Sequence, residues 1–164
     1  MQPLAAGMAG AAPTVKVGPA NPERAKYRSM WDKPEYRRFA PGEQAASMFL
    51  AQARLRPDAD VIDFGCGTGR GALMIALMGG ARVQMLDFAE NCLDPEVRQA
   101  LDTQNGRLKF AVCDLTNPIP YHAAYGFCTD VMEHIPPEDV LKVLKNILAA
   151  AEHGRRFRSS AFMA

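Results

Sequence analysis

Residues 61–71 read VIDFGCGTGRG, and this stretch decides the fold. A short apolar run, which predicts a buried strand, leads into three glycines at positions 65, 67 and 69 and then into a helical segment. Glycine permits positive φ angles and carries no side chain, so a ligand can lie against the backbone of such a loop. The N–H groups at the start of the following helix add a partial positive charge. The stretch therefore predicts a strand, a ligand-binding glycine loop and a helix.

Strand-like and helix-like segments alternate on either side of this unit. Strands are predicted over 60–64, 82–86, 108–113 and 125–129, and helices over 42–55, 71–78, 94–102 and 136–151. Such alternation is typical of an α/β fold, in which right-handed crossovers pair the strands in parallel. The last helix carries an apolar stripe that we expect to face the core, formed by Val140, Leu141, Leu144, Ile147 and Leu148.

Length and charge exclude several classes of protein. The chain has 164 residues, which suits one domain with a buried core. Its 19 Lys and Arg nearly balance its 18 Asp and Glu, which argues against a nucleic-acid surface and a polybasic membrane anchor. The sequence contains neither the roughly 18 consecutive apolar residues of a spanning helix nor a secretory signal. We therefore expect a cytoplasmic protein that binds neither membrane nor nucleic acid.

The near-neutral total conceals an uneven distribution of charge. Residues 1–20, rich in Ala, Gly and Pro, are predicted to form a flexible leader. Residues 21–56 carry eight basic and four acidic residues and are predicted to form a helical or lid segment, in which Trp31 and Tyr36 either cover a ligand or pack onto the sheet. Residues 57–152, with seven basic and fourteen acidic residues, form the predicted ligand-binding core, and residues 153–164 an atypical basic tail.

The cysteine spacing predicts no metal site. Cys66, Cys92, Cys113 and Cys128 are separated by 26, 21 and 15 residues, with no C-x-x-C pair and no paired histidines nearby. That spacing matches neither a zinc-binding pattern nor a compact disulfide framework. We therefore expect four free thiols in a reducing compartment.

The glycine loop is the first of four motifs through which the sequence resembles the class I S-adenosylmethionine-dependent methyltransferases. The second is MLDFAE, in which Asp87 ends the second strand 18 residues after Gly69. The third is CDL at 113–115, and the fourth is DVMEHI at 130–135. Each motif lies at the carboxyl end of a predicted strand, the edge at which open α/β sheets bind ligands. The resemblance covers about residues 40–152.

The resemblance implies a Rossmann-like, doubly wound and mostly parallel sheet with flanking helices. The sequence supplies about four of the family's seven strands, for which the implied order is 3-2-1-4. S-adenosylmethionine is the implied cofactor, and an unidentified small molecule the implied methyl acceptor. The implied cofactor-binding residues are Asp63, Gly65, Cys66, Gly67, Gly69, Asp87, Phe88, Asp114, Leu115 and Asp130.

The resemblance also implies roles for individual side chains, each with a structural alternative. Asp87 would accept from the ribose hydroxyls or cap a helix, and Phe88 would lie against the adenine or pack in the core. Asp114 would accept from the adenine amino group or form an Asx-turn. Asp130 lies at the ligand edge or caps a turn, while Asp63 would place the ammonium group through the loop or through water. His134 is a weak candidate for a general base and otherwise positions neighbouring groups.

The end of the sequence departs from the resemblance. HGRRFRSSAFMA at 153–164 stands where an apolar fifth strand is expected. We therefore expect a truncated or frame-shifted product of a longer methyltransferase, whose open sheet edge a partner or a second copy would cover. The chain is then a methyltransferase, or a non-catalytic cofactor-binding fragment or pseudoenzyme that acts by association. An NAD(P)-dependent oxidoreductase is a weaker alternative, because Arg70 interrupts the G-x-G-x-x-G pattern.

Overall fold

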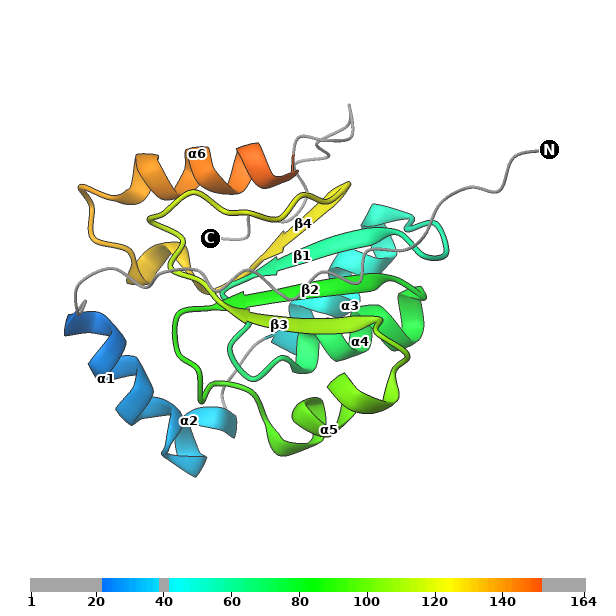
Figure 1. Ribbon diagram of the computed structural model, residues 1–164, viewed down its shortest axis with the longest axis horizontal. Coiled ribbons are helices and arrows are strands. Elements are labelled where there is room, and N and C mark those ends of the chain that lie inside the picture. Colours follow the sequence, from blue (N-terminus) through cyan, green and yellow to red (C-terminus); the bar gives the residue numbers. More distant parts are fainter. Residues whose placement is uncertain (1–21, 39–41, 152–164) are drawn as a thin grey trace.

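Four parallel strands form the centre of the described structure and lie in the order β3-β2-β1-β4. This computed structural model describes residues 22–38 and 42–151. The strands are β1 (Asp60–Phe64), β2 (Arg82–Asp87), β3 (Leu108–Val112) and β4 (Tyr125–Cys128). Their carboxyl ends meet at one edge of the sheet (Figure 1). The predicted Rossmann-like α/β sheet and its strand order are thereby confirmed.

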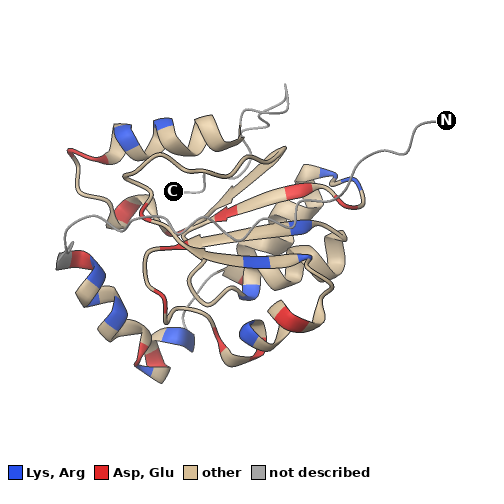
Figure 2. Cartoon of the chain, in the orientation of Figure 1, with Lys and Arg blue, Asp and Glu red and all other residues tan. Residues whose placement is uncertain are grey.

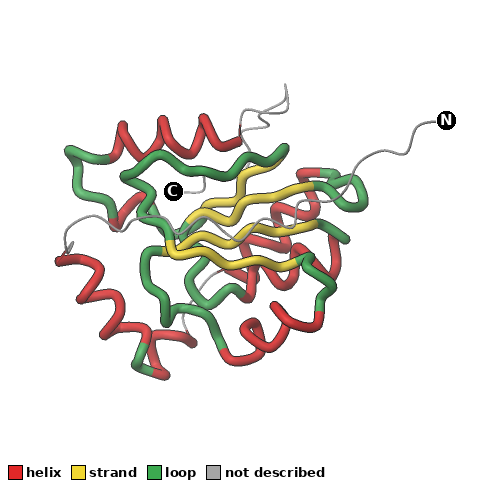
Figure 3. The backbone as a smooth tube through the Cα atoms, viewed as in Figure 1, coloured by secondary structure: helices red, strands yellow, loops and turns green. Residues whose placement is uncertain are grey.

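Helices cover both faces of this sheet (Figures 1 and 3). One face packs against α3 (Gly42–Ala53), α4 (Arg70–Gly79) and α5 (Pro95–Thr103), and the other against α6 (Val140–Ala151). Successive side chains of a strand point to opposite faces, so Val61 belongs to the first buried cluster and Ile62 to the second. Burial on both faces explains why β1 reads as a nearly continuous apolar run.

Two short helices at the N-terminal side lie near the carboxyl edge of the sheet (Figure 1). They are α1 (Pro22–Trp31) and α2 (Pro34–Arg38), and together they are called the N-terminal cap below. Figure 2 shows basic positions along both helices of the cap. The predicted helical segment over 21–56 therefore divides into this cap and α3, which packs against α4.

The last helix differs from the prediction in its start and in the side it buries. Residues 136–139 form a turn, in which the Asp139 N–H donates to the Pro136 carbonyl over 2.9 Å, and α6 begins only at Val140. Leu141 is 70% exposed, whereas Val143 is completely buried. The predicted stripe is thus confirmed at Ile147, which is 2% exposed, and wrong at Leu141, whose place in the core is taken by Val143.

The remaining predictions on chain organisation concern its two ends. The leader at 1–20 and the tail at 153–164 lie outside the described residues.

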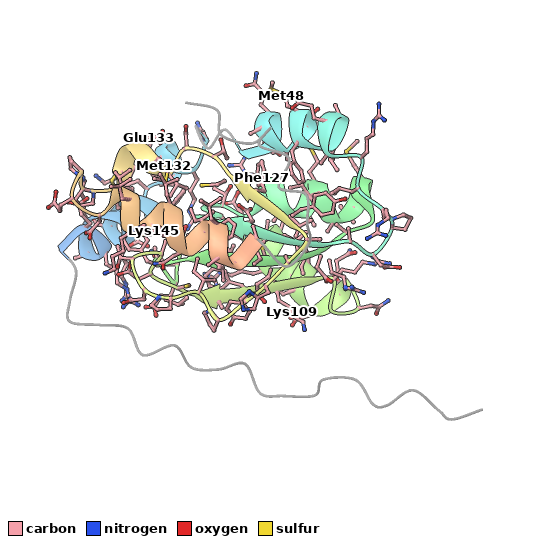
Figure 4. All side chains as sticks on the ribbon, turned by 90° about the horizontal axis from the view of Figure 1, so that it is seen from above. Met48, Lys109, Phe127, Met132, Glu133 and Lys145 are labelled. Carbon is pink, nitrogen blue, oxygen red and sulfur yellow. The ribbon has the colours of Figure 1, made fainter. Side chains whose placement is uncertain are left out.

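Within the described part, β4 pairs with β1 alone, and Phe127 of β4 packs against Phe49 of α3 with ring centres 5.4 Å apart. Figure 4 shows Phe127 inside the molecule and Met48 on its surface. No helix among these residues is long and apolar enough to span a membrane.

Candidate functional site

A cavity of about 370 Å³ opens where the four strands end. The segment that follows each strand contributes to its wall, and the cap closes it with the side chains of Tyr27, Trp31 and Tyr36. The predicted site residues that line the cavity are Gly65, Cys66, Gly67, Asp87, Phe88, Asp114, Leu115, Asp130 and His134. Residues as far apart as Gly65 and His134, 69 positions in the sequence, are brought together because parallel strands end at the same edge.

The glycine loop, residues 65–69, forms the floor of the cavity. Gly67 has φ of 51°, and a Cβ atom there would lie 3.0 Å from Cη2 of Trp31, so the cap rests directly on this glycine. Gly69 has a different role: it does not line the cavity, and a Cβ atom there would lie 2.8 Å from both Leu93 and Val97. Gly67 therefore shapes the cavity, whereas Gly69 allows α5 and its preceding loop to pack closely.

The Asp87 carboxylate lies at the bottom of the cavity, at the end of β2. The side chain accepts the Gly67 N–H on Oδ2 over 3.0 Å and the Ala89 N–H on Oδ1 over 2.8 Å. Asp87 is only 5% exposed. Burial raises its pKa to about 6, against the lowering effect of these backbone hydrogen bonds. The carboxylate is thus held rigidly, and each oxygen keeps a free lone pair for a ligand.

Asp63 lies deeper, in β1, and does not line the cavity. Only 3% of the residue is exposed, and no described residue donates a hydrogen bond to its carboxyl group. Burial, with a smaller contribution from the charge of Asp87, raises the pKa of Asp63 to about 8. From this position Asp63 can influence a ligand only indirectly, which is the kind of role predicted from the sequence.

Asp114 forms the Asx-turn that was one of its two predicted arrangements, and its role toward adenine stays a prediction. Its Oδ1 accepts the backbone N–H of Thr116 over 2.9 Å and the Thr116 hydroxyl over 2.8 Å, which is an Asx-turn. The same residue lines the cavity. Its Oδ2 accepts no hydrogen bond from the described residues. The turn therefore orients the carboxylate while one oxygen stays available.

Aromatic rings from the cap and from the sheet edge form one wall of the cavity. The ring of Tyr27 lies 5.4 Å from that of Phe88 and 5.4 Å, edge-on, from that of His134. Trp31 and Tyr36 pack edge-on against each other at 4.8 Å. Burial raises the pKa of Tyr27 to about 12, so its hydroxyl stays neutral at physiological pH. Trp31 and Tyr36 pack on the core, as one alternative predicted, and both also line the cavity; a role in covering a ligand stays a prediction.

The segment after β4 supplies the remaining predicted residues. Asp130 is exposed and has φ of 53°, a conformation that few non-glycine residues adopt. Partial desolvation of its carboxyl group, together with a hydrogen bond to Glu133, raises the pKa of Asp130. Glu133 and the exposed His134 lie on the short 3₁₀ helix Met132–His134. No described contact singles out His134 as a base, so its catalytic role stays a prediction.

Arg37 has a structural role that sequence reasoning missed. Its guanidinium donates to the backbone carbonyls of Trp31, Asn91 and Cys92 over 2.7, 2.7 and 2.8 Å. Arg37 thereby ties the cap to the loop after β2. No local pattern could reveal this contact, because the two segments are more than 50 positions apart in the sequence.

The charge of the cavity wall is negative. Five carboxylate side chains line it, and none of the described lining residues is Lys or Arg. The five acidic residues are Glu23, Asp87, Asp114, Asp130 and Asp139. Figure 2 shows acidic positions in the loops at this end of the sheet. Such a wall favours a positively charged ligand and disfavours a pyrophosphate.

Comparisons with known proteins agree with this geometry. Residues 61–154, more than half of the chain, match the sequence profile of the family described as "Methyltransferase domain". No curated protein sequence matches the chain significantly.

Solved structures with the same fold include three methyltransferase structures. Magnesium protoporphyrin IX methyltransferase from Synechocystis PCC 6803, with bound S-adenosylmethionine, has a TM-score of 0.62 and 18% identity, over 83% of this chain and 75% of that one. The 1,6-didemethyltoxoflavin-N1-methyltransferase of Burkholderia thailandensis has a TM-score of 0.65 and 22% identity, over 84% and 62%. A chain from the complex of the Haloferax volcanii Trm112 methyltransferase activator with a putative methyltransferase has a TM-score of 0.60 and 17% identity, over 81% and 57%.

The chain thus spans less than two thirds of the length of the last two structures. At these identities the structures establish the fold, and the match of the sequence profile establishes the family. The chain belongs to the methyltransferase-domain family and has the Rossmann-like fold of the class I, S-adenosylmethionine-dependent methyltransferases.

Proposed function

We propose that the cavity binds S-adenosylmethionine and that the protein transfers its methyl group to a small-molecule acceptor. The observation that carries the proposal is the Asp87 carboxylate, fixed by two backbone N–H groups at the bottom of a cavity with a glycine floor. A rigid acceptor with free lone pairs suits a ribose diol, whose two hydroxyls are donors.

The other lining residues suit the remaining parts of the same ligand. Phe88 offers an aromatic face next to Asp87, and the free Oδ2 of Asp114 can accept from an amino group such as that of adenine. The glycine loop lets the amino-acid part of the cofactor approach the backbone, because Gly67 has no side chain to exclude it.

The charge of the wall favours this cofactor over a nicotinamide dinucleotide. S-adenosylmethionine carries a positive sulfonium and no phosphate, so the acidic lining attracts it. A dinucleotide would place its pyrophosphate among the same carboxylates, with no lining Lys or Arg among the described residues to neutralise it. The wall therefore supports the methyltransferase proposal against the oxidoreductase alternative.

The size of the cavity supports a small acceptor. Sites for small molecules measure roughly 300–1,000 Å³. This cavity, at about 370 Å³, lies near the lower end of that range, and the cofactor and the acceptor would have to share it. Two of the similar structures are a magnesium protoporphyrin IX methyltransferase and a 1,6-didemethyltoxoflavin-N1-methyltransferase, the second with bound 1,6-didemethyltoxoflavin. The four free thiols fit a protein of the reducing cytoplasm, which is the location we propose.

The sulfonium supplies an already activated methyl group, so the protein has to align the acceptor and exclude water. The cap suits this task, because Tyr27, Trp31 and Tyr36 cover the cavity while their rings pack on the core. His134 lies at the rim, where it can orient an acceptor or take a proton from it.

Calorimetric titration of the whole chain with S-adenosylhomocysteine and, separately, with NADH tests the proposal. We expect binding of S-adenosylhomocysteine and none of NADH, and the reverse result would support the oxidoreductase instead. A folded protein that binds neither contradicts the proposal. Release of S-adenosylhomocysteine during incubation with panels of small acceptors then separates an enzyme from a non-catalytic cofactor-binding protein.

A further inference from the structure

Three side chains that are far apart in the sequence meet beneath the floor of the cavity. The sulfur atoms of Cys66 and Cys92 and a carboxylate oxygen of Asp87 all lie within 4.8 Å of one another. Cys66 belongs to the glycine loop, Asp87 ends β2, and Cys92 lies in the loop before α5. The cysteine spacing predicted no metal site, but spacing reveals only ligands that are close in sequence, whereas the fold assembles this group across 26 positions.

The charge around this cluster is uncompensated. Among the described residues, no Lys or Arg forms an ion pair with the Asp87 carboxylate. The nearby cation Arg37 is directed to Asp94 and to backbone carbonyls instead. A buried carboxylate without a cation is costly, and a bound cation would relieve that cost.

The geometry of the cluster suits a tetrahedral metal ion. With zinc–sulfur bonds of about 2.3 Å, two sulfur ligands of a tetrahedron lie about 3.8 Å apart, which small rotations of the two thiols can provide from the present spacing. The Asp87 carboxylate is already oriented by Gly67 and Ala89, as metal-binding carboxylates commonly are by their own hydrogen bonds. Cys66 and Asp87 also line the cavity, so an ion and a water ligand can enter from it.

We propose that Cys66, Asp87 and Cys92 form a binding site for Zn²⁺, with a fourth coordination position open to the cavity. Two sulfur ligands and one carboxylate select zinc over the hard cations Mg²⁺ and Ca²⁺, which prefer oxygen ligands. Each thiol releases its proton to solvent as its sulfur–zinc bond forms, and no oxidation state changes.

Zinc at this site would affect binding of the cofactor, an inference that rests on the proposed function. The Asp87 carboxylate would serve both the ribose hydroxyls of the cofactor and the metal ion. Since zinc would take one of the two free lone pairs that the ribose diol needs, together with the space beside it, we infer that zinc and cofactor exclude each other. Zn²⁺ is then a competitive inhibitor of cofactor binding, acting through the floor of the cavity.

Titration of the reduced whole chain with Co²⁺ tests the site without any cofactor. We expect one equivalent to produce a thiolate-to-cobalt charge-transfer band and the visible bands of tetrahedral cobalt, and Zn²⁺ to abolish both. Cys92→Ser should weaken Co²⁺ binding at least about tenfold. Cys128→Ser, a buried thiol in the cluster on the other face of the sheet, should leave it unchanged. Absence of the charge-transfer band, or equal losses in both variants, overturns the proposal.

X-ray absorption at the zinc edge gives a test that needs no variant to fold. The zinc-loaded wild-type chain should show two sulfur ligands, completed by oxygen ligands. One sulfur or none contradicts the assignment of Cys66 and Cys92.

Titration with S-adenosylhomocysteine at increasing Zn²⁺ tests the mutual exclusion. We expect its apparent affinity to fall in proportion to zinc saturation, and an unchanged affinity for the zinc-loaded protein rejects the exclusion. If S-adenosylhomocysteine fails to bind even without zinc while the cobalt bands appear, the proposed function fails and the metal site stands.

Discussion

Arg37 in the N-terminal cap donates from Nη1 to Oδ1 of Asp94 over 2.8 Å, across 57 positions of sequence. The other carboxylate oxygen of Asp94 lies 2.9 Å from Nε of Arg70, the first residue of α4. Arg70 also donates to the backbone carbonyl of Arg37. Asp94 thus joins the cap to the helix that follows the glycine loop, and the position of the cap over the cavity depends on this half-buried network.

Replacing Arg37 with alanine should loosen the cap. The variant loses the contact with Asp94 and three hydrogen bonds to carbonyls, which we expect to lower the free energy of unfolding by about 1–3 kcal/mol. Hydrogen exchange should accelerate over residues 22–38 and stay slow in β1. Arg38→Ala is the matched control, since Arg38 is exposed and its side chain forms no hydrogen bond with the described residues. Equal effects of the two variants would disprove the role of Arg37.

Gly67→Ala should disturb the contact between the glycine loop and the cap. The new Cβ would lie 3.0 Å from Cη2 of Trp31 at a φ of 51°, so both steric contact and backbone strain oppose it. Gly106→Ala isolates the strain, because Gly106 has φ of 74° with no atom within 4 Å of its Cβ position. We expect about 1 kcal/mol of destabilisation at Gly106, and a larger loss at Gly67 that also weakens S-adenosylhomocysteine binding. Intact binding in a folded Gly67 variant would contradict our account of the floor.

Sequence reasoning placed the strands well because each has a local cause. β1, for instance, is a short apolar run that ends at the first glycine, and the parallel pairing of all four strands brings Asp87 and Asp114 to one edge. These features depend on residues that are adjacent in sequence and on a general rule for parallel sheets.

The parts that sequence reasoning missed depend on contacts between distant segments. The cap is attached through Arg37 to a loop far along the chain, and Cys66 lies near Cys92 because β1 and β2 pair. The burial of Val143 in place of Leu141 was also missed, since both residues are apolar and packing decides which one is buried. Such contacts follow from the assembled fold and leave no periodic pattern in the sequence.

Asp87→Asn tests the central assignment of the proposed function. The amide keeps the shape of the side chain but replaces one acceptor oxygen by a donor, so we expect S-adenosylhomocysteine binding to weaken by about 1–3 kcal/mol.

Because the pKa of Asp87 is raised to about 6, wild-type affinity should increase as the pH rises through that value and the carboxylate ionises. The variant should lack this rise. Calorimetry over this pH range provides the measurement, with the exposed Asp102→Asn as control. A pH profile shared by wild type and Asp87→Asn would remove Asp87 from the site.

The buried carboxyl group of Asp63 should make the protein less stable as the pH rises. In the unfolded chain this group loses its proton near its ordinary pKa of 3.8, whereas in the folded protein burial raises the pKa to about 8. Between these values the folded protein binds one proton more than the unfolded chain, so the free energy of unfolding falls with increasing pH. Urea denaturation at several pH values between about 4 and about 8 measures this slope.

Asp63→Asn should flatten that slope, because the amide does not titrate. Asp60→Asn is the control: Asp60 lies in the same strand but is exposed and paired with Arg82 at 2.8 Å, so its replacement should leave the slope intact. A slope that persists in the Asp63 variant would mean that another buried group, with Asp87 as the first candidate at its lower pKa of about 6, dominates the pH dependence.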